Sequence, residues 1–173
     1  VTGVQKEAEL SLRYADQARI LSLKVGDRAG EAWSHFYIGH AHLLKNDFQQ
    51  AQDAFSASIL LREESNQMNL VMEAQAGLVE TALREGDLSE AAKRAEVILA
   101  HLANNGTLDG TEEPLRIYLA VYQALKELKD PRASSILQTA KQILDGQVSL
   151  LKDELSRNMY VQNVPWRKAI QEE

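Results

Sequence analysis

Histidines are the residues of this chain best suited to metal or acid–base chemistry. His35, His40 and His42 fall within one expected helix, and His101 is isolated. Zinc ligands on a helix are usually three or four residues apart, so that both reach one ion. No two of these three histidines have that spacing, and His35 and His42, which share a face, are seven residues apart. We therefore expect no metal and no cofactor, with His35 and His42 packed between helices and His40 facing a groove.

Other catalytic groups are equally unsupported by their spacing. The paired carboxylates lie at expected helix ends or at the last residues of the sequence, where charge is usually solvated or aligned with a helix dipole: Glu63-Glu64, Glu112-Glu113 and Glu172-Glu173. The sequence contains no cysteine and no GxSxG, GxxxxGK[ST] or GxGxxG motif, so thiol and acyl-transfer nucleophiles and phosphate-binding loops lack a candidate. We expect that this chain is not an enzyme.

The composition is that of one ordinary soluble domain. Of its 173 residues, 45% are hydrophobic and 25% are charged, and its net charge of −6 argues against binding nucleic acid through basic side chains. The sequence shows no apolar stretch of membrane-spanning length and no signal peptide. We expect a cytoplasmic protein that contacts neither nucleic acid nor membrane.

The hydrophobic pattern predicts an all-α protein. Apolar residues recur at helical spacing through nearly the whole chain, and alternation with period two is scarce. The expected helices cover 4–25, 29–45, 48–64, 68–85, 89–104, 112–128 and 131–145, followed by one near 147–157 and a short one after Pro165.

Turn chemistry separates these helices. Three tight turns each combine a turn-forming residue with a side-chain oxygen that can cap the next helix: Lys45-Asn46-Asp47, Glu85-Gly86-Asp87 and Lys129-Asp130-Pro131. The one long loop covers 104–111. Thr111, followed by Glu112, Glu113 and Pro114, is expected to cap the helix that comes next.

An internal repeat of about forty residues organises the chain. Aligning 26–55 with 66–95 superimposes Asp47 on Asp87, Phe48 on Leu88 and Ala51 on Ala91, and places Gly39 close to the position of Gly77 and Val79. Two antiparallel helices can cross closely only where small side chains meet and large ones fill the space beside them. Repeated, such hairpins form a solenoid in which each unit touches only its neighbours.

The segment 26–145 resembles tetratricopeptide repeats (TPRs) of the forty-residue variety. The pattern is Gly39, Asp47-Phe48, Ala51 and Phe55 in one copy and Asp87-Leu88, Ala91 and Ala95 in the next. This resemblance implies a right-handed superhelix of antiparallel helix hairpins. The short segments 25–32, 129–133 and 163–167 are also similar to the C-terminal repeat regions of bacterial signalling ATPases, transcription regulators and nucleotide cyclases.

The repeat divides the chain into five parts. These are 1–25, the second helix of a truncated repeat; the repeats 26–65, 66–105 and 106–145; and 146–173, a C-terminal capping segment with a short helix. The first helix carries more apolar surface than one neighbour can cover, at Leu10, Tyr14, Leu21 and Leu23, so we expect an upstream domain and a possible homodimer through this helix. The tail alternatively acts as a linear peptide that docks elsewhere.

The first helix of each hairpin is expected to line the concave side of the superhelix. Its outward stripe supplies the candidate ligand- and partner-binding residues: Trp33, Phe36 and His40 in the first complete repeat, Glu73, Glu80 and Arg84 in the second, and Tyr118, Tyr122 and Lys126 in the third. A position in the core remains the alternative for Trp33, Phe36 and Tyr122.

The leading hypothesis is a non-catalytic protein–protein interaction module that binds a protein or peptide in this groove, as the regulatory region of a larger bacterial signalling or transcription-control protein. The alternative is a sensor domain that binds a small molecule or peptide there and modulates an attached effector domain. An enclosed pocket of a few hundred cubic ångströms, rather than an open channel, would favour the sensor over the interaction module.

Overall fold

A computed structural model describes residues 3–173 and shows an all-α protein, with no strand in that part of the chain. Its helices are α1 (Gly3–Val25), α2 (Arg28–Lys45), α3 (Phe48–Glu64), α4 (Met68–Glu85), α5 (Leu88–Ala103), α6 (Pro114–Glu127), α7 (Ala133–Ser149), α8 (Glu154–Gln162) and α9 (Pro165–Glu172). The bounds of the first six agree with the sequence prediction to within two residues. The helix predicted near 147–157 is wrong, because α7 continues to Ser149 and α8 begins only at Glu154.

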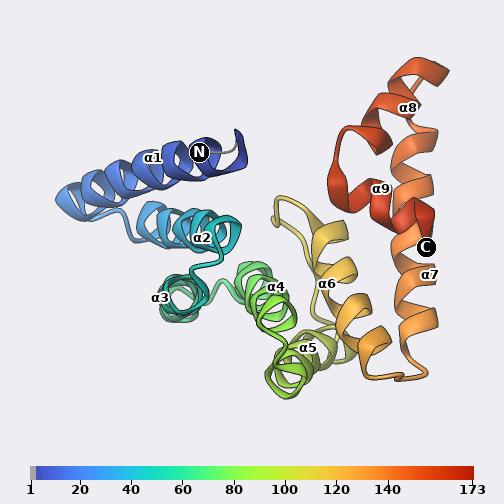
Figure 1. Cartoon of the computed structure of the whole chain (residues 1–173), viewed down its shortest axis with the longest axis horizontal. Coiled ribbons are helices and arrows are strands. Elements are labelled where there is room, and N and C mark those ends of the chain that lie inside the picture. The colour runs from blue at the N-terminus through green and yellow to red at the C-terminus, as the bar shows by residue number, and fades with distance from the viewer. Residues whose placement is uncertain (1–2) are drawn as a thin grey trace.

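The helices pack in chain order. Each one contacts the next along the sequence, and α4 also contacts both α2 and α6. Figure 1 shows that they follow an arc with α2, α4 and α6 along its inner side. At the end of the chain, α9 turns back onto α6 and α7. This sequential packing is compatible with a helical repeat, and it leaves three inner helices and α9 to form the surface on the inner side.

Left-handed residues end two of the inner helices. Asn46 (φ 62°) follows α2 and Gly86 (φ 85°) follows α4, and the backbone N–H of each donates to carbonyls in the last turn of its helix. Asp87 then caps α5 by accepting from the backbone N–H of Glu90, as predicted. The equivalent prediction for Asp47 is wrong. Its carboxylate makes no capping bond.

Asp47 is instead held by the preceding helix. Its carboxylate lies 3.3 Å from His42 Nδ1 and 3.4 Å from Lys45 Nζ. These contacts, with the hydrogen bond to His42 as the largest cause, lower the pKa of Asp47. The residue therefore stabilises the turn from the α2 side and leaves the first amides of α3 without a side-chain cap.

The start of α6 also differs from the prediction. The helix begins at Pro114 with Glu113 at the N-cap position, and Thr111 donates to the carbonyl of Leu108 rather than capping the helix. The proline suits a first helical position because it has no N–H to leave unpaired. This later start leaves Glu112 in a bend ahead of α6, where its backbone N–H donates to the carboxylate of Glu73 on α4.

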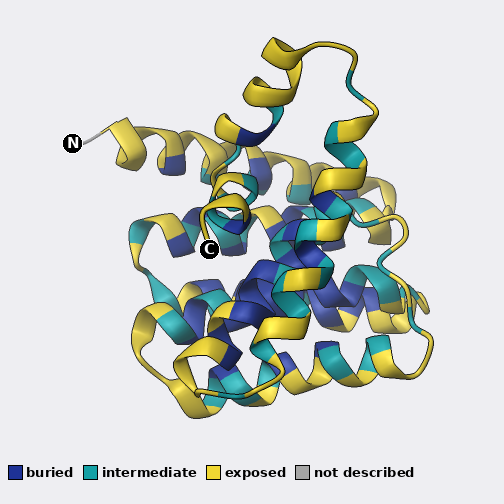
Figure 2. Ribbon diagram, turned by 90° about the vertical axis from the view of Figure 1, so that its right-hand side faces the viewer, coloured by how far each residue is buried: buried dark blue, intermediate teal, exposed yellow. Residues whose placement is uncertain are grey.

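A phenylalanine fills the space between the first two hairpins. Phe55 is fully buried, and a Cβ built on Gly39 or Gly77 would lie 2.7 Å or 2.5 Å from its ring. The ring thus rests on the bare backbones of α2 and α4, which confirms the expectation of small residues where helices cross. Figure 2 shows that buried residues lie on the sides of the helices that face one another and that the outward sides are exposed.

The outer face of α1 is uncovered. The side chains of Leu10, Tyr14, Leu21 and Leu23 are 46%, 57%, 60% and 50% exposed. The excess of apolar surface expected from the sequence is therefore present on this helix. The homodimer through it stays a prediction.

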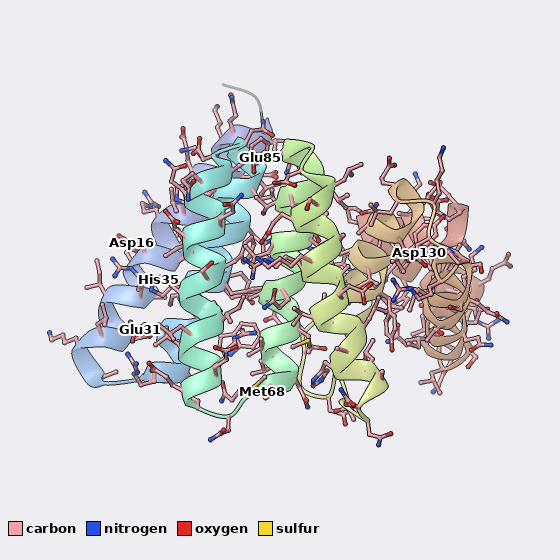
Figure 3. All side chains as sticks on the ribbon, turned by 90° about the horizontal axis from the view of Figure 1, so that it is seen from below. Asp16, Glu31, His35, Met68, Glu85 and Asp130 are labelled. Carbon is pink, nitrogen blue, oxygen red and sulfur yellow. The ribbon has the colours of Figure 1, made fainter. Side chains whose placement is uncertain are left out.

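We expect the carboxyl group of Asp130 to titrate with a pKa of about 2, below its ordinary value of 3.8. This residue, which Figure 3 labels, accepts from the backbone N–H of Arg132 at 2.9 Å and from its guanidinium at 2.7 Å in the turn between α6 and α7. A lowered pKa contributes stability above the ordinary value, and that stability is lost as the pH falls towards 2. NMR titration of the carboxyl carbon measures this pKa, and the Arg132→Ala variant should raise it towards 3.8. A native midpoint near the ordinary value would contradict the turn geometry.

Candidate functional site

A cavity of about 220 Å³ lies on the inner side of the arc, and we name it the central pocket. Its lining comes from α2, α4, α6, α9 and the two residues before α6: Phe36, Tyr37, His40, Glu73, Ala76, Gly77, Glu80, Glu112, Glu113, Arg116, Ile117 and Trp166. Helices far apart in sequence thus converge on one place. Its walls combine apolar side chains with a group of charged residues.

Aromatic rings form the α2 side of the pocket. The ring of Phe36 meets the rings of Tyr37 and His40 edge to face, with centroids 5.4 and 4.5 Å apart. His40 in turn lies 4.9 Å from the buried ring of Phe55. The core contact between the hairpins and the pocket wall are therefore one continuous aromatic cluster.

Arg116 links all four helices around the pocket. From α6, its guanidinium makes two 2.8 Å hydrogen bonds to the carboxylate of Glu80 on α4. The same group donates to His40 Nδ1 on α2 at 3.0 Å and lies 5.2 Å from the centroid of the Trp166 ring on α9. A bidentate pair of this kind fixes both partners in orientation.

His40 is a neutral histidine with one unused hydrogen-bonding atom. Burial, together with the charge of Arg116, holds the pKa of His40 well below its ordinary value. Because a guanidinium can only donate, Nδ1 must accept, and the hydrogen of the neutral ring is on Nε2. His40 Nε2 is buried and has no hydrogen-bond partner among the described residues.

A buried ion pair lies behind the pocket. Arg62 and Glu73 are 3.0 Å apart, with side chains only 1% and 4% exposed. The guanidinium of Arg62 also lies 4.3 Å from the centroid of the Trp33 ring and donates to the carbonyl of Leu70. Burial raises the pKa of Glu73 and lowers that of Arg62, while the attraction between them opposes both shifts.

The residues before α6 close one side of the pocket. The Tyr37 hydroxyl donates to the carboxylate of Glu112, and burial together with this bond raises the pKa of Tyr37. Glu113 accepts from the indole N–H of Trp166 at 2.8 Å and from the guanidinium of Arg167. This short segment therefore connects α2 to α9.

The structure brings four of the nine predicted binding residues together. Phe36, His40, Glu73 and Glu80 line the central pocket. Trp33 is half-buried and lies against Arg62, outside the lining. Phe36 itself is only 6% exposed, so it belongs to the core as well as to the pocket wall.

The other predicted residues lie elsewhere. Arg84 holds adjacent hairpins together, because it donates to the Leu43 carbonyl and to Asn46 Oδ1, each at 2.7 Å. Glu173 is bound by both Tyr122 at 2.8 Å and Lys126 at 2.7 Å. Tyr122 is 6% exposed and Tyr118 is half-buried, so the α6 stripe packs against the C-terminal segment.

Sequence reasoning missed several residues of the pocket: Tyr37, Glu112, Glu113, Arg116, Ile117 and Trp166. The adjacent carboxylates before Pro114 were a usable signal, since charge at a helix start is also well placed to meet a groove. No local pattern indicates that Trp166 reaches back to α6.

A second, more open hollow of about 620 Å³ runs along α1, α2 and α3. Figure 3 labels Asp16 and His35, which both line it. Burial and the nearby charge of Arg19 lower the pKa of His35. Within residues 3–173, no group of three or more His, Asp or Glu side chains is placed to hold a metal ion.

Comparisons with protein-family models, with curated proteins and with solved structures find no match to this chain. In the described part of the molecule, no helix has the length and apolar character needed to cross a membrane.

Proposed function

We propose that this chain is a non-catalytic protein–protein interaction module, a right-handed TPR-type superhelix that binds a peptide segment of its partner on the inner side of the arc. The observation that carries the proposal is the central pocket, where α2, α4, α6 and α9 converge on one cavity. Apolar and aromatic walls with polar groups at the edge are typical of the anchor sites of protein interfaces.

The central pocket, at about 220 Å³, is close to the size expected of a sensor, but it suits a peptide anchor better than a drug-sized free ligand. Pockets for drug-sized molecules usually span about 300–1,000 Å³. At about 220 Å³, the central pocket lies below that range and suits one side chain of a larger partner. The rest of the partner would lie along α2, α4 and α6.

A sensor domain is the second candidate, and the construction of the pocket favours it. Its walls come from three hairpins and the C-terminal segment, so a bound molecule would prefer one curvature of the arc and shift the population towards it. Placement in a bacterial signalling or transcription-control protein is part of the proposal, and it is supported by the similarity of segments 25–32, 129–133 and 163–167.

Filling the pocket is expected to weaken peptide binding about tenfold or more, the loss typical of a blocked anchor site. Peptides are selected from a displayed random library on the wild-type chain, and their affinities are compared with those for the Ala76→Leu variant. Ala76 lines the pocket and is 2% exposed, so the added carbons occupy the cavity. Ala100→Leu, on the exposed side of α5, is the matched control and should bind as the wild type does.

Ile117→Phe on the facing wall serves as a second pocket-filling variant. Circular dichroism spectra and melting temperatures establish that each variant is folded. Selected peptides that bind all variants equally would place the site elsewhere. Failure to enrich any peptide, combined with a rise in melting temperature on adding small molecules, would favour the sensor.

A further inference from the structure

The charges around the central pocket are balanced with one exception. Three cations pair one to one with three carboxylates: Arg62 with Glu73, Arg116 with Glu80, and Arg167 with Glu113. Glu112 accepts only from the neutral Tyr37 hydroxyl and has no ion-pair partner within residues 3–173. The pocket therefore carries one uncompensated negative charge, on an exposed residue at its edge.

The aromatic side chains of the pocket suit a ligand that carries a positive charge at the end of an apolar chain. Phe36, Tyr37 and Trp166 all line it, and the Trp166 ring already holds the guanidinium of Arg116 at 5.2 Å. Aromatic faces attract cations, and long basic side chains bury their methylene stems while their charged ends stay near water. Both requirements meet where the apolar cavity opens beside Glu112.

We propose that the central pocket takes a lysine side chain of the partner peptide, with its ammonium group at Glu112 and its methylene stem against Phe36 and Ile117. A lysine side chain meets both requirements, because it carries its ammonium group at the end of a flexible aliphatic chain. This inference rests on the proposed function and specifies the chemistry of the anchor.

The test uses blocked five-residue glycine peptides that carry lysine, norleucine or glutamate at the centre, with n-butylammonium as a free amine. Binding is followed by the NMR signal of the Trp166 indole N–H, assigned by its loss in Trp166→Phe. We expect the lysine peptide to bind about threefold to fivefold more tightly than the norleucine peptide, as for a partly exposed ion pair. The preference should fall at high salt, because the charge of Glu112 is then screened.

The Glu112→Gln variant should abolish the preference for lysine while keeping an oxygen for Tyr37. Glu127→Gln makes the same change of charge on an exposed residue at the far end of α6, about 20 Å from Pro114 at 1.5 Å per residue, and should retain the preference.

Three results would overturn the inference. Equal binding of the lysine and norleucine peptides, both weakened by Ala76→Leu, would remove the lysine anchor and leave the proposed function intact. Binding of n-butylammonium as tight as that of the lysine peptide would assign the site to a free amine. If the glutamate peptide bound most tightly, the pocket would prefer a negatively charged ligand instead of a positively charged one. The proposed function fails separately, if library-selected peptides bind without regard to the pocket variants.

Discussion

Replacement of Arg62 by methionine is expected to lower the free energy of unfolding by about 3–5 kcal/mol at pH 7, the cost of leaving one partner of a buried ion pair alone. Methionine keeps most of the volume of the side chain but removes the cation that faces Glu73 at 3.0 Å. It also removes the guanidinium from the ring of Trp33 and from the Leu70 carbonyl. Denaturant unfolding followed by circular dichroism measures the loss.

The effect of Arg62→Met should depend on pH in a defined direction. Burial already raises the pKa of Glu73, and losing Arg62 raises it further because the cation no longer favours the carboxylate. A raised pKa contributes stability that is complete below the ordinary value of 4.5 and is lost as the pH rises through the folded value. The variant should therefore differ least from the wild type near pH 4 and most at neutral pH.

Two further variants separate the contribution of the ion pair to stability from that of side-chain packing. Arg62→Met combined with Glu73→Gln should recover about 1 kcal/mol or more of the single loss, because no unpaired carboxylate remains buried. Glutamine still offers an oxygen to the backbone N–H of Glu112. Arg28→Met breaks an ion pair with Glu64 whose side chains are 55% and 50% exposed, and it should cost far less than Arg62→Met because solvent screens the pair. Equal losses for Arg28→Met and Arg62→Met would contradict a special role for the buried pair.

The helices and most of their ends could be predicted because they depend on neighbouring residues. Helical spacing of apolar residues, Gly86 after α4 and the cap at Asp87 are all local features. The start of α6 was misplaced because Thr111 is a preferred N-cap residue, whereas the helix begins at Pro114 and Glu113 at the N-cap position makes no side-chain capping bond. Small residues at Gly39 and Gly77 indicated the helix crossing, although not which ring would fill it.

The site could be predicted only where one helix carried the whole signal. Phe36 and His40 follow a stripe on α2, and Glu73 and Glu80 follow one on α4, so periodicity alone placed them on the inner side. Arg116 belongs to the pocket through partners on other helices, Glu80 at 2.8 Å and His40 at 3.0 Å, and no spacing along the sequence encodes such contacts.

The C-terminal segment explains why the predicted binding residues on α6 lie outside the central pocket. Tyr122 and Lys126 form a regular stripe on α6, which is the pattern expected for a free binding surface. Glu173 binds both of them in the folded chain. Periodicity shows that a face is amphipathic, but it does not reveal whether another protein or the same chain covers that face.

Truncation of Phe55 to alanine is expected to cost about 3–5 kcal/mol, the range for removing a large aromatic side chain from a core. The ring is fully buried between α2 and α4 and lies against the ring of His40 with centroids 4.9 Å apart. The cavity left behind cannot close easily, because Gly39 and Gly77 present backbone rather than movable side chains. Thermal and denaturant unfolding measure the loss.

The same ring should make added volume at Gly77 unfavourable. Gly77→Ala places a Cβ 2.5 Å from Phe55 and is expected to destabilise by about 1–3 kcal/mol, as overpacking does. Gly146→Ala is the matched control on α7, where nothing lies within 4 Å of the added Cβ, and it should stabilise by about 0.5–1 kcal/mol through helix propensity. If Gly77→Ala destabilises the protein while Gly146→Ala stabilises it, steric contact with Phe55, rather than backbone preference, is the cause of the loss at Gly77.

Combining Phe55→Ala with Gly77→Ala tests whether the two positions act as one unit. The alanine methyl group would then enter the space that the ring has left, so the double variant should lose at least about 1 kcal/mol less than the sum of the single losses. Additive losses, or a stabilising Gly77→Ala, would contradict the contact. A coupling of the expected sign would mean that Phe55 sets the distance between α2 and α4. His40 in the pocket wall lies against the same ring, so a change in the distance between α2 and α4 would also move one wall of the central pocket.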